Sequence, residues 1–142
     1  MNWIDQAMSK FGNRLAQHTI EVPITDLSGQ YALPDDTIMR SCHIVGIYAT
    51  DNASDDKKAP SGRVLIGPVA MRNSYLSIKC NNLIVWKDTP LAYLTLTTAD
   101  RSVGAIDIQG ITPNQSFVRI ADTGGITVGE SVLLHILYVD NK

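Results

Sequence analysis

Histidine and cysteine are the residues in this chain with the widest range of chemistry, and their positions favour structural roles. The histidines are His18, His43 and His135, and the cysteines are Cys42 and Cys80. A zinc site needs three or four nitrogen or sulfur ligands at converging positions, and the sequence has no His-x-His or Cys-x-x-Cys. Cys42 and His43 are neighbours on an expected strand, so their side chains point to opposite faces and cannot form a nucleophile–base pair. We expect structural histidines and free, buried thiols, with a disulfide as the alternative for the cysteines.

The glycines of residues 62–67 match a phosphate-binding loop, but the residues after them do not. That motif requires Lys and then Ser or Thr after its second glycine, to bind phosphate and Mg²⁺. Pro68 and Val69 stand at those places, and no helix is expected to follow. We therefore reject nucleotide binding at this segment.

A cluster of acidic residues in the polar segment 51–62 raises the question of calcium. Asp51, Asp55 and Asp56 supply carboxylates of the kind that Ca²⁺ prefers. The EF-hand pattern fails at Ala53, and the segment lacks the glycine and the closing glutamate of that loop. We expect a solvated loop balanced by the pair Lys57–Lys58, with an irregular Ca²⁺ site as the alternative, and we expect no bound metal or cofactor.

The remaining candidates for catalysis or ligand binding are weak. Glu21 and Glu130 lie near opposite ends of the chain and do not suggest the paired carboxylates of a glycosidase, although pairs of Asp remain open. A small β-barrel hydrolase would depend on a polar cluster around residues such as Asp107 or His135. We expect the protein not to be an enzyme.

Three aromatic residues suggest a platform on which sugar rings stack, as in carbohydrate-binding sandwiches. They are Trp86, Tyr75 and Tyr93. Because they alternate with Leu, Ile and Thr, core positions are favoured over exposed ones.

Composition points to a single domain that contacts other proteins rather than nucleic acid. The chain has 142 residues, a net charge of −2, and only 18% charged residues against a typical ~25%. Together with a mean hydropathy of +0.01, this suggests apolar surface covered by a partner, the alternative being a monomer. The basic residues are scattered, which disfavours binding to a phosphate backbone. No transmembrane run or signal peptide is recognised, so we expect a protein made and used without export.

Only the first residues have helical periodicity. Residues 2–16 carry apolar side chains at helical spacing, namely Trp3, Ile4, Ala7, Met8, Phe11 and Leu15. So short a helix is marginal alone, so its apolar stripe must dock, either on its own sandwich or on a neighbouring subunit. With few basic residues, a membrane surface is the least favoured choice. The division expected is a helical arm over 1–17 and a β-domain over 18–142.

After residue 17 the pattern changes to short strands separated by turns. We expect strands at 19–24, around 31–33, and at 38–50, 63–66, 75–80, 83–87, 91–96, 105–108, 117–121 and 131–139. Asn81 and Asn82 favour a type I′ turn between two of them. The last strand is apolar on both faces, which predicts a place in the middle of a sheet whose outer face is also covered. These patterns predict an all-β fold: an antiparallel β-sandwich or jelly roll of about eight strands with a short N-terminal amphipathic helix.

The chain resembles the single jelly-roll structural proteins of viruses, in particular small capsid or vertex proteins of bacteriophages. The resemblance lies in the N-terminal helical arm and in segments 73–96 and 124–142, which are similar to inner and terminal strands of such subunits. It rests on pattern and length, so no functional residue carries across. One departure is that the arm is not rich in Arg and Lys, which implies contact with protein neighbours more than with the genome.

The resemblance implies a virion structural protein, whether capsid, penton (vertex) or minor capsid component, assembled in the host cytoplasm. Copies of itself and other capsid proteins would be its partners, in a homo-oligomer held by apolar edges and the N-terminal helix. The expected assembly interface is the helix stripe of Trp3, Ile4, Met8, Phe11 and Leu15. The alternative is a ligand-binding β-sandwich, such as a carbohydrate-binding module or a phage receptor-binding domain.

Overall fold

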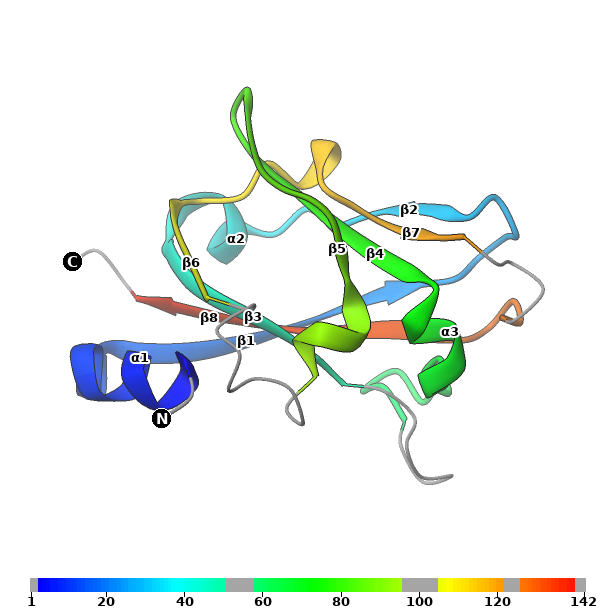
Figure 1. Cartoon of the computed structure of the whole chain (residues 1–142), viewed down its shortest axis with the longest axis horizontal. Helices are drawn as coiled ribbons and strands as arrows, with labels where there is room; N and C mark the ends of the chain where they lie inside the picture. The colour runs from blue at the N-terminus through cyan, green and yellow to red at the C-terminus, as the bar shows by residue number, and fades with distance from the viewer. Residues whose placement is uncertain (1–2, 51–57, 96–104, 122–125, 140–142) are drawn as a thin grey trace.

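The protein is a sandwich of two antiparallel four-stranded sheets (Figure 1). The computed structural model describes residues 3–50, 58–95, 105–121 and 126–139. The first sheet has the strand order β1-β8-β3-β6, and the second has the order β2-β7-β4-β5. The prediction of an all-β sandwich with about eight strands is confirmed. Asp51, Asp55 and Asp56, on which the calcium interpretation depended, lie outside the described residues.

The strands alternate between the two sheets along much of the chain. The first sheet contains β1 (Leu15–Pro23), β3 (His43–Thr50), β6 (Ala105–Gln109) and β8 (Ser131–Val139). The second contains β2 (Gln30–Ala32), β4 (Ser74–Cys80), β5 (Leu83–Pro90) and β7 (Phe117–Ile120). The helices are α1 (Trp3–Phe11), α2 (Thr37–Ser41) and α3 (Pro68–Arg72), with 3₁₀ turns η1 (Gly12–Arg14), η2 (Leu91–Leu94) and η4 (Pro113–Gln115). No helix in the described ranges is long and apolar enough to cross a membrane.

The core lies between the sheets and is built mainly from alternate residues of the strands, with a register shift in β3 between Ile44 and Gly46. The first sheet contributes Ile20, Val22, Ile44, Ile47, Leu134 and Ile136, and the second contributes Tyr31, Leu76, Ile78, Val118 and Ile120. Short helical segments close the gaps with Met39 of α2, Met71 of α3, and Leu91 and Leu94 of η2, all of them buried. Each large apolar side chain buried in this way contributes about 1.5–3 kcal/mol to folding.

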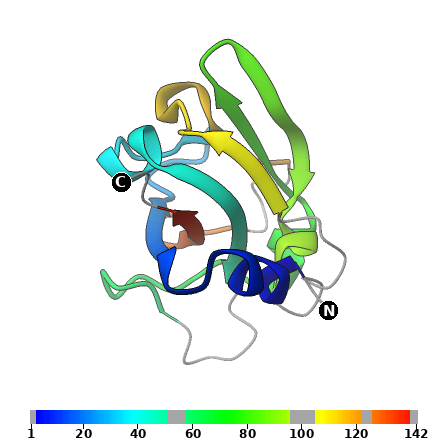
Figure 2. The same cartoon turned by 90° about the vertical axis from the view of Figure 1, so that its left-hand side faces the viewer.

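The strand β8 has the place that its sequence predicts. It pairs with β1 on one side and with β3 on the other. On its outer face, Leu133 packs with Ala59 and Leu65 in a small separate cluster. At the other end, Leu137 and Val139 pack against α1, which lies across the outside of the first sheet (Figure 2). The expected covering of both faces is therefore confirmed.

The strand expected over 38–50 is wrong in its first part. Residues Thr37–Ser41 form helix α2. The carboxylate of Asp36 caps this helix by accepting hydrogen bonds from the backbone N–H groups of Ile38 (2.8 Å) and Met39 (3.2 Å). Asp at this place is a strong helix start signal, and one helical turn suffices to bury Met39. The strand β3 begins only at His43.

Three other expectations about local structure are also wrong. Residues 91–94 form the 3₁₀ turn η2, in which the three-residue period places buried Leu91 and Leu94 on one side. Residues 63–66 make only isolated bridges, and the short helix α3 does follow residue 67, with Pro68 in its first turn.

The turn between β4 and β5 also differs in detail from the one predicted. The hairpin and its two-residue connection are as expected, since Cys80 pairs with Leu83. A type I′ turn needs positive φ at both central residues, and only Asn81 has it, with φ 55°.

The helical arm is shorter than the range 1–17. The helix α1 ends at Phe11, and β1 begins at Leu15 because Leu15–Pro23 pairs with β8 along its whole length. Backbone hydrogen bonds to β8 satisfy these residues in place of helical ones.

Replacing Gly110 by alanine should destabilise the fold strongly. Gly110 has φ +87°, and a Cβ there would press against the backbone carbonyl of Arg40, 3.0 Å from its carbon. Gly62 is a matched control, because it has φ +92° but open space around it. We expect Gly110→Ala to lower the free energy of unfolding by about 3 kcal/mol and Gly62→Ala by about 1 kcal/mol. Urea unfolding measures both, and equal losses would contradict the prediction.

Candidate functional site

The helix stripe is divided between internal packing and exposure. Phe11 and Leu15 pack on the outer face of the first sheet, with Ala7, Val45, Leu137 and Val139. Met8 is exposed. Trp3 and Ile4 belong to α1, but their side chains lie outside the described part of the chain. Docking of the helix on its own sandwich thus accounts for Phe11, whereas Leu15 packs there as the first residue of β1.

The second sheet carries an apolar hollow of about 140 Å³ beside its edge strand β5. We call it the Trp86 hollow. Its lining consists of Ser77, Ile78, Lys79, Ile84, Trp86, Lys87, Gln115 and Phe117. Trp86 and Phe117 are half-buried, while Ile84 is 55% exposed, so the hollow is open to solvent and has an aromatic lining. Trp86 also packs partly against the core, so the expected core position holds for only part of its side chain.

The backbone of β5 is irregular on both sides of Trp86. Ile78 of β4 pairs with Trp86, yet Leu76 pairs with Thr89 and Lys79 with Ile84. In each direction from Trp86, β5 therefore has one residue more than β4. Such bulges bend a strand and redirect its side chains. Asp88, within the second bulge, has φ 52°, a conformation that costs energy for a residue other than glycine.

Four hydrogen-bond donors of the hollow have no partner among the residues that the structure describes. They are the ammonium groups of Lys79 and Lys87, the indole N–H of Trp86 and the side-chain amide of Gln115. Only the amide also carries an acceptor. Together with the apolar lining, these donors suit a ligand that has one apolar surface and also carries acceptor oxygens and negative charge.

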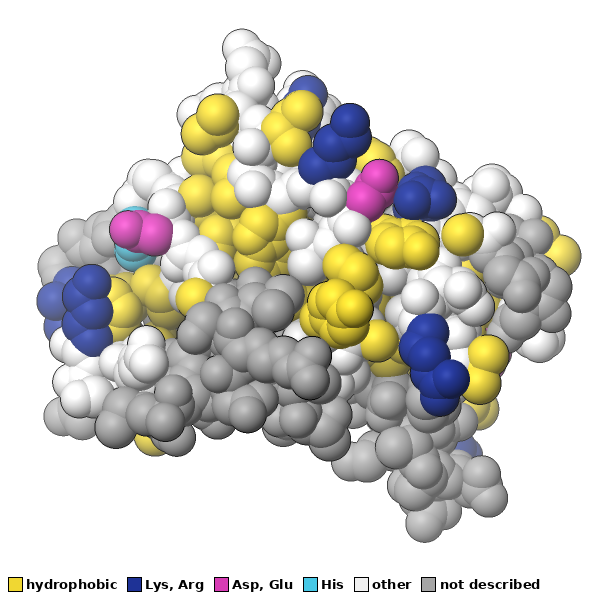
Figure 3. Space-filling model, in the orientation of Figure 1, with side chains coloured by type: hydrophobic (Ala, Val, Ile, Leu, Met, Phe, Trp, Pro, Cys, Tyr) yellow, Lys and Arg dark blue, Asp and Glu magenta, His cyan; other side chains and the backbone are white. Residues whose placement is uncertain are grey.

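Beside the hollow, a third cation is already engaged. The guanidinium of Arg119 lies 4.7 Å from the ring centroid of Tyr75, and its Nε is 3.4 Å from Asp88 Oδ1. The backbone N–H of Asp88 donates to Ser77 Oγ at 3.1 Å. In Figure 3, hydrophobic side chains over the second sheet lie next to Lys and Arg side chains. Because Arg119 is engaged by these contacts, Lys79 and Lys87 supply the positive charge that lines the hollow.

A polar cluster around His135 occupies the outer face of the first sheet, between the two apolar clusters of β8. Tyr48 stacks on the imidazole with 4.5 Å between ring centroids. His135 Nδ1 lies 3.0 Å from Thr19 Oγ1 and 3.3 Å from Gln17 Nε2, and its Nε2 lies 2.7 Å from Thr50 Oγ1. The cluster joins β1, β3 and β8.

The hydrogen bonds of this cluster favour a neutral imidazole. Tyr48 donates to Gln17 Oε1 at 2.8 Å, so the Gln17 amide nitrogen donates to His135 Nδ1. Nδ1 is then an acceptor, and Nε2–H donates to Thr50. Burial lowers the pKa of His135 in agreement with this. No carboxylate is among its described partners, so the cluster lacks the third group that orients a catalytic histidine.

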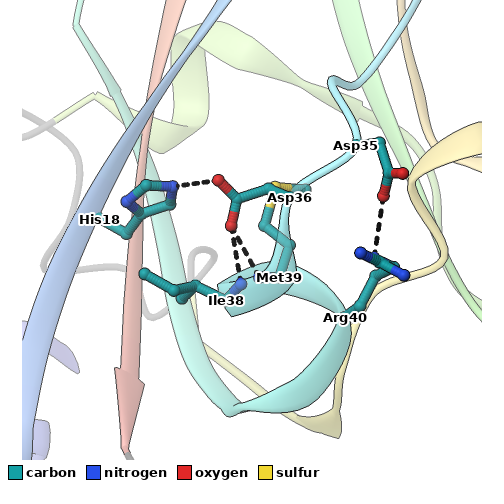
Figure 4. A network of polar contacts seen from close by, with 6 residues as sticks. All are labelled: His18, Asp35, Asp36, Ile38, Met39 and Arg40. Carbon is teal, nitrogen blue, oxygen red and sulfur yellow. Dashed lines mark hydrogen bonds and ion pairs between the residues drawn. The ribbon is translucent and has the colours of Figure 1, made fainter.

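The other two histidines pair with aspartates. His18 Nε2 lies 2.6 Å from Asp36 Oδ2, at the start of α2 (Figure 4). Burial raises the pKa of Asp36, but hydrogen bonds from His18, Met39 and Ile38 outweigh it and lower that pKa overall. His43 Nε2 lies 2.6 Å from Oδ1 of exposed Asp107, between β3 and β6. Both pairs stabilise connections between elements.

These contacts do not assemble a metal or hydrolytic centre. Asp107 bonds to His43 and not to His135, so the two residues singled out for a hydrolase belong to different contacts. In the described ranges, no group of three or more His, Cys, Asp or Glu could hold a metal ion. Cys42 and Cys80 form no disulfide with each other, and both are half-buried rather than fully buried as expected.

The Trp86 hollow is the feature that sequence patterns missed. Alternation assigns Trp86 to the core, whereas the bulges of β5 carry it to the edge of a hollow. A signal was present in Lys87–Asp88, where two charged residues interrupt an apolar strand pattern.

Replacing Asp36 should separate its capping role from its pairing with His18. Asp36→Ala removes both and should cost about 1–2 kcal/mol of unfolding free energy. Asp36→Asn keeps an acceptor oxygen for Ile38 and Met39 and should cost about half as much. Chemical denaturation at pH 7 measures the two losses. A loss for Asn as large as for Ala would show that the cap contributes little.

The stability of the protein should fall as the pH drops below the unfolded-state pKa of His135, near 6.5. Below that pH the unfolded chain binds a proton that the folded chain resists, and the loss continues down to the lowered folded-state pKa. His135→Gln should flatten the dependence of unfolding free energy on pH between 7 and 5. NMR titration of the ring gives the folded-state pKa, and a value above 6.5 would contradict the prediction.

Comparisons of this chain with known proteins give no direct indication of its function. No family model, no curated protein and no solved structure matches it.

Proposed function

We propose that the protein is a structural subunit of a virion, built on a jelly roll, that assembles with copies of itself and with other capsid proteins. The observation that carries the proposal is the pattern of strand pairing. β1 pairs with β8, β2 with β7, β3 with β6 and β4 with β5, all antiparallel. These are the pairs of one long hairpin folded at the β4–β5 turn.

A hairpin of this kind becomes a sandwich when it is rolled up. Rolling adds the pairs β3·β8 and β4·β7, which bring the strands into two sheets of four. Two interlocked Greek keys of eight strands are the definition of a jelly roll, an architecture used by viral capsid and lectin domains. Because capsid and lectin domains share this architecture, the choice of a capsid role is argued from the surface of the molecule.

The surface offers apolar positions suited to contacts between subunits. β5 and β6 are edge strands on the same side of the sandwich (Figure 2). Leu83 at the start of β5 is 67% exposed, and Met8 on α1 is 57% exposed. Apolar residues on an exposed edge are a liability unless a partner covers them. Burying each would contribute about 1.5–3 kcal/mol before the costs of association.

The helix α1 fits the role of an N-terminal arm. It is attached to the first sheet through Ala7 and Phe11 and leaves Met8 available for a neighbour. The arm carries Lys10 and Arg14 and no cluster of basic residues, which supports contact with protein rather than with the genome. The site of action we propose is the virion, after assembly in the host cytoplasm, with closed rotational symmetry as the natural form of the homo-oligomer.

The test is the mass of the full chain by light scattering after size exclusion, beside two surface variants. Met8→Lys and Leu83→Lys change exposed residues, so both should fold normally while shifting the oligomer towards monomer. Val69→Lys is the matched control, because Val69 is equally exposed but lies on α3. A monomeric full chain, or variants with unchanged mass, would refute the proposal.

Deleting residues 1–14 tests the arm itself. We expect a smaller assembly together with some loss of stability, because the deletion uncovers Val45, Leu137 and Val139. Thermal unfolding of the shortened chain separates failed folding from failed assembly. A folded, shortened chain that assembles like the full one would show that α1 serves only its own sheet.

A further inference from the structure

We infer that the Trp86 hollow is a binding site for a carboxylated sugar. This inference is independent of the proposed assembly. It begins from the two kinds of residue that line the hollow. Some are apolar or aromatic, among them Ile84, Trp86 and Phe117. Others carry polar ends, namely Lys79, Lys87 and Gln115.

A sugar ring in the pyranose form has the same two-sided character. One face presents C–H groups, which pack on the electron-rich face of an aromatic ring. The edges present hydroxyl and ring oxygens, which accept hydrogen bonds. The hollow of about 140 Å³ has the volume of about five water molecules at roughly 30 Å³ each, which is the scale of a single ring.

Charge decides which sugars fit. The two lysines have no anionic partner in the described part of the chain, and Asp88, which follows Lys87 in β5, is engaged by Arg119. A carboxylate on the ligand would satisfy both ammonium groups through charge-assisted hydrogen bonds. Trp86 N–H and the Gln115 amide would then donate to hydroxyl oxygens. Uronic and sialic acids have this combination, whereas glucose lacks the charge.

The backbone indicates that the site is shaped rather than accidental. β5 departs from regular pairing on both sides of Trp86, and Asp88 is held at positive φ. The bond from Asp88 N–H to Ser77 Oγ and the contact of Asp88 with Arg119 hold this bulge in place. A regular edge strand would avoid the strain of positive φ at Asp88. The bulges instead redirect the side chain of Trp86 towards the hollow.

The experiment uses tryptophan fluorescence of the full chain. The chain has two tryptophans, so Trp3→Phe leaves Trp86 as the reporter. Titration with glucuronate and with N-acetylneuraminate should give a saturable change that weakens as salt is added. Glucose and benzoate are the comparison ligands, the first lacking charge and the second lacking the sugar ring. Both should bind at least about tenfold more weakly.

Variants tie binding to the hollow. Lys79→Gln combined with Lys87→Gln should weaken glucuronate binding about tenfold. Arg72→Gln combined with Lys58→Gln is the matched control, because it removes two exposed charges that do not line the hollow. It should leave affinity within twofold. Ligand-detected NMR of Trp86→Leu, with unchanged thermal unfolding, should show loss of the signal.

The possible failures are distinct from failure of assembly. Absence of saturable binding by either acidic sugar would overturn the inference, whatever the mass of the oligomer. Equal binding of benzoate would overturn the sugar assignment. A change of oligomeric mass in the lysine variant, without any sugar binding, would show that a second copy covers the hollow. Light scattering of the same samples makes that comparison.

Discussion

The burial of β8 on both faces is the constraint on which the rest of the structure depends. Its inner side chains, such as Leu134 and Ile136, fill the space between the sheets. Its outer side chains, Leu133, Leu137 and Val139, would meet water if the sandwich stood alone. Two segments outside the sheets cover them: α1 at one end and residues 59–65 at the other. The His135 cluster occupies the middle of β8, between these two covering segments. Every described contact of His135 there is made by a hydroxyl, an amide or an aromatic ring.

Much of the fold followed from periodicity, because two-residue alternation and breaker residues report directly on which side chains are buried. The central place of β8 is an example, since a strand apolar on both faces has few other places to go. The strand predictions failed where a short segment formed a helical turn instead. Asp36 started a single helical turn inside an apparent strand, and the pair Leu91 and Leu94 satisfied the core as well in a 3₁₀ turn as in a strand. The spacing of apolar residues cannot distinguish a short helical turn from a strand, because a single buried residue per turn is compatible with either structure.

The candidate site was harder to foresee, because it depends on register. Whether Trp86 lies in the core or beside a hollow is decided by two extra residues in β5, and an extra residue reverses the side of every residue after it. Gln115, which lines the hollow, lies on η4, between β6 and β7. The β4·β7 pairing and the hydrogen bond from Lys79 N–H to Ser116 Oγ bring that region beside β4. Local sequence could mark Lys87 and Asp88 as unusual in a strand. It could not say which residues they would face.

The pairing of β1 with β8 also has a kinetic consequence. Leu15 lies opposite Val139, so β1 cannot form its pairing until β8 has been synthesised. During synthesis, β1 emerges before β8, and among the described strand pairs only β4·β5 joins strands that follow one another in the sequence. Pairing across nearly the whole chain gives a high contact order, which slows folding. A newly made chain thus presents unpaired apolar strands until β8 has been synthesised, and dependence on chaperones in the cell would be a natural outcome of its topology.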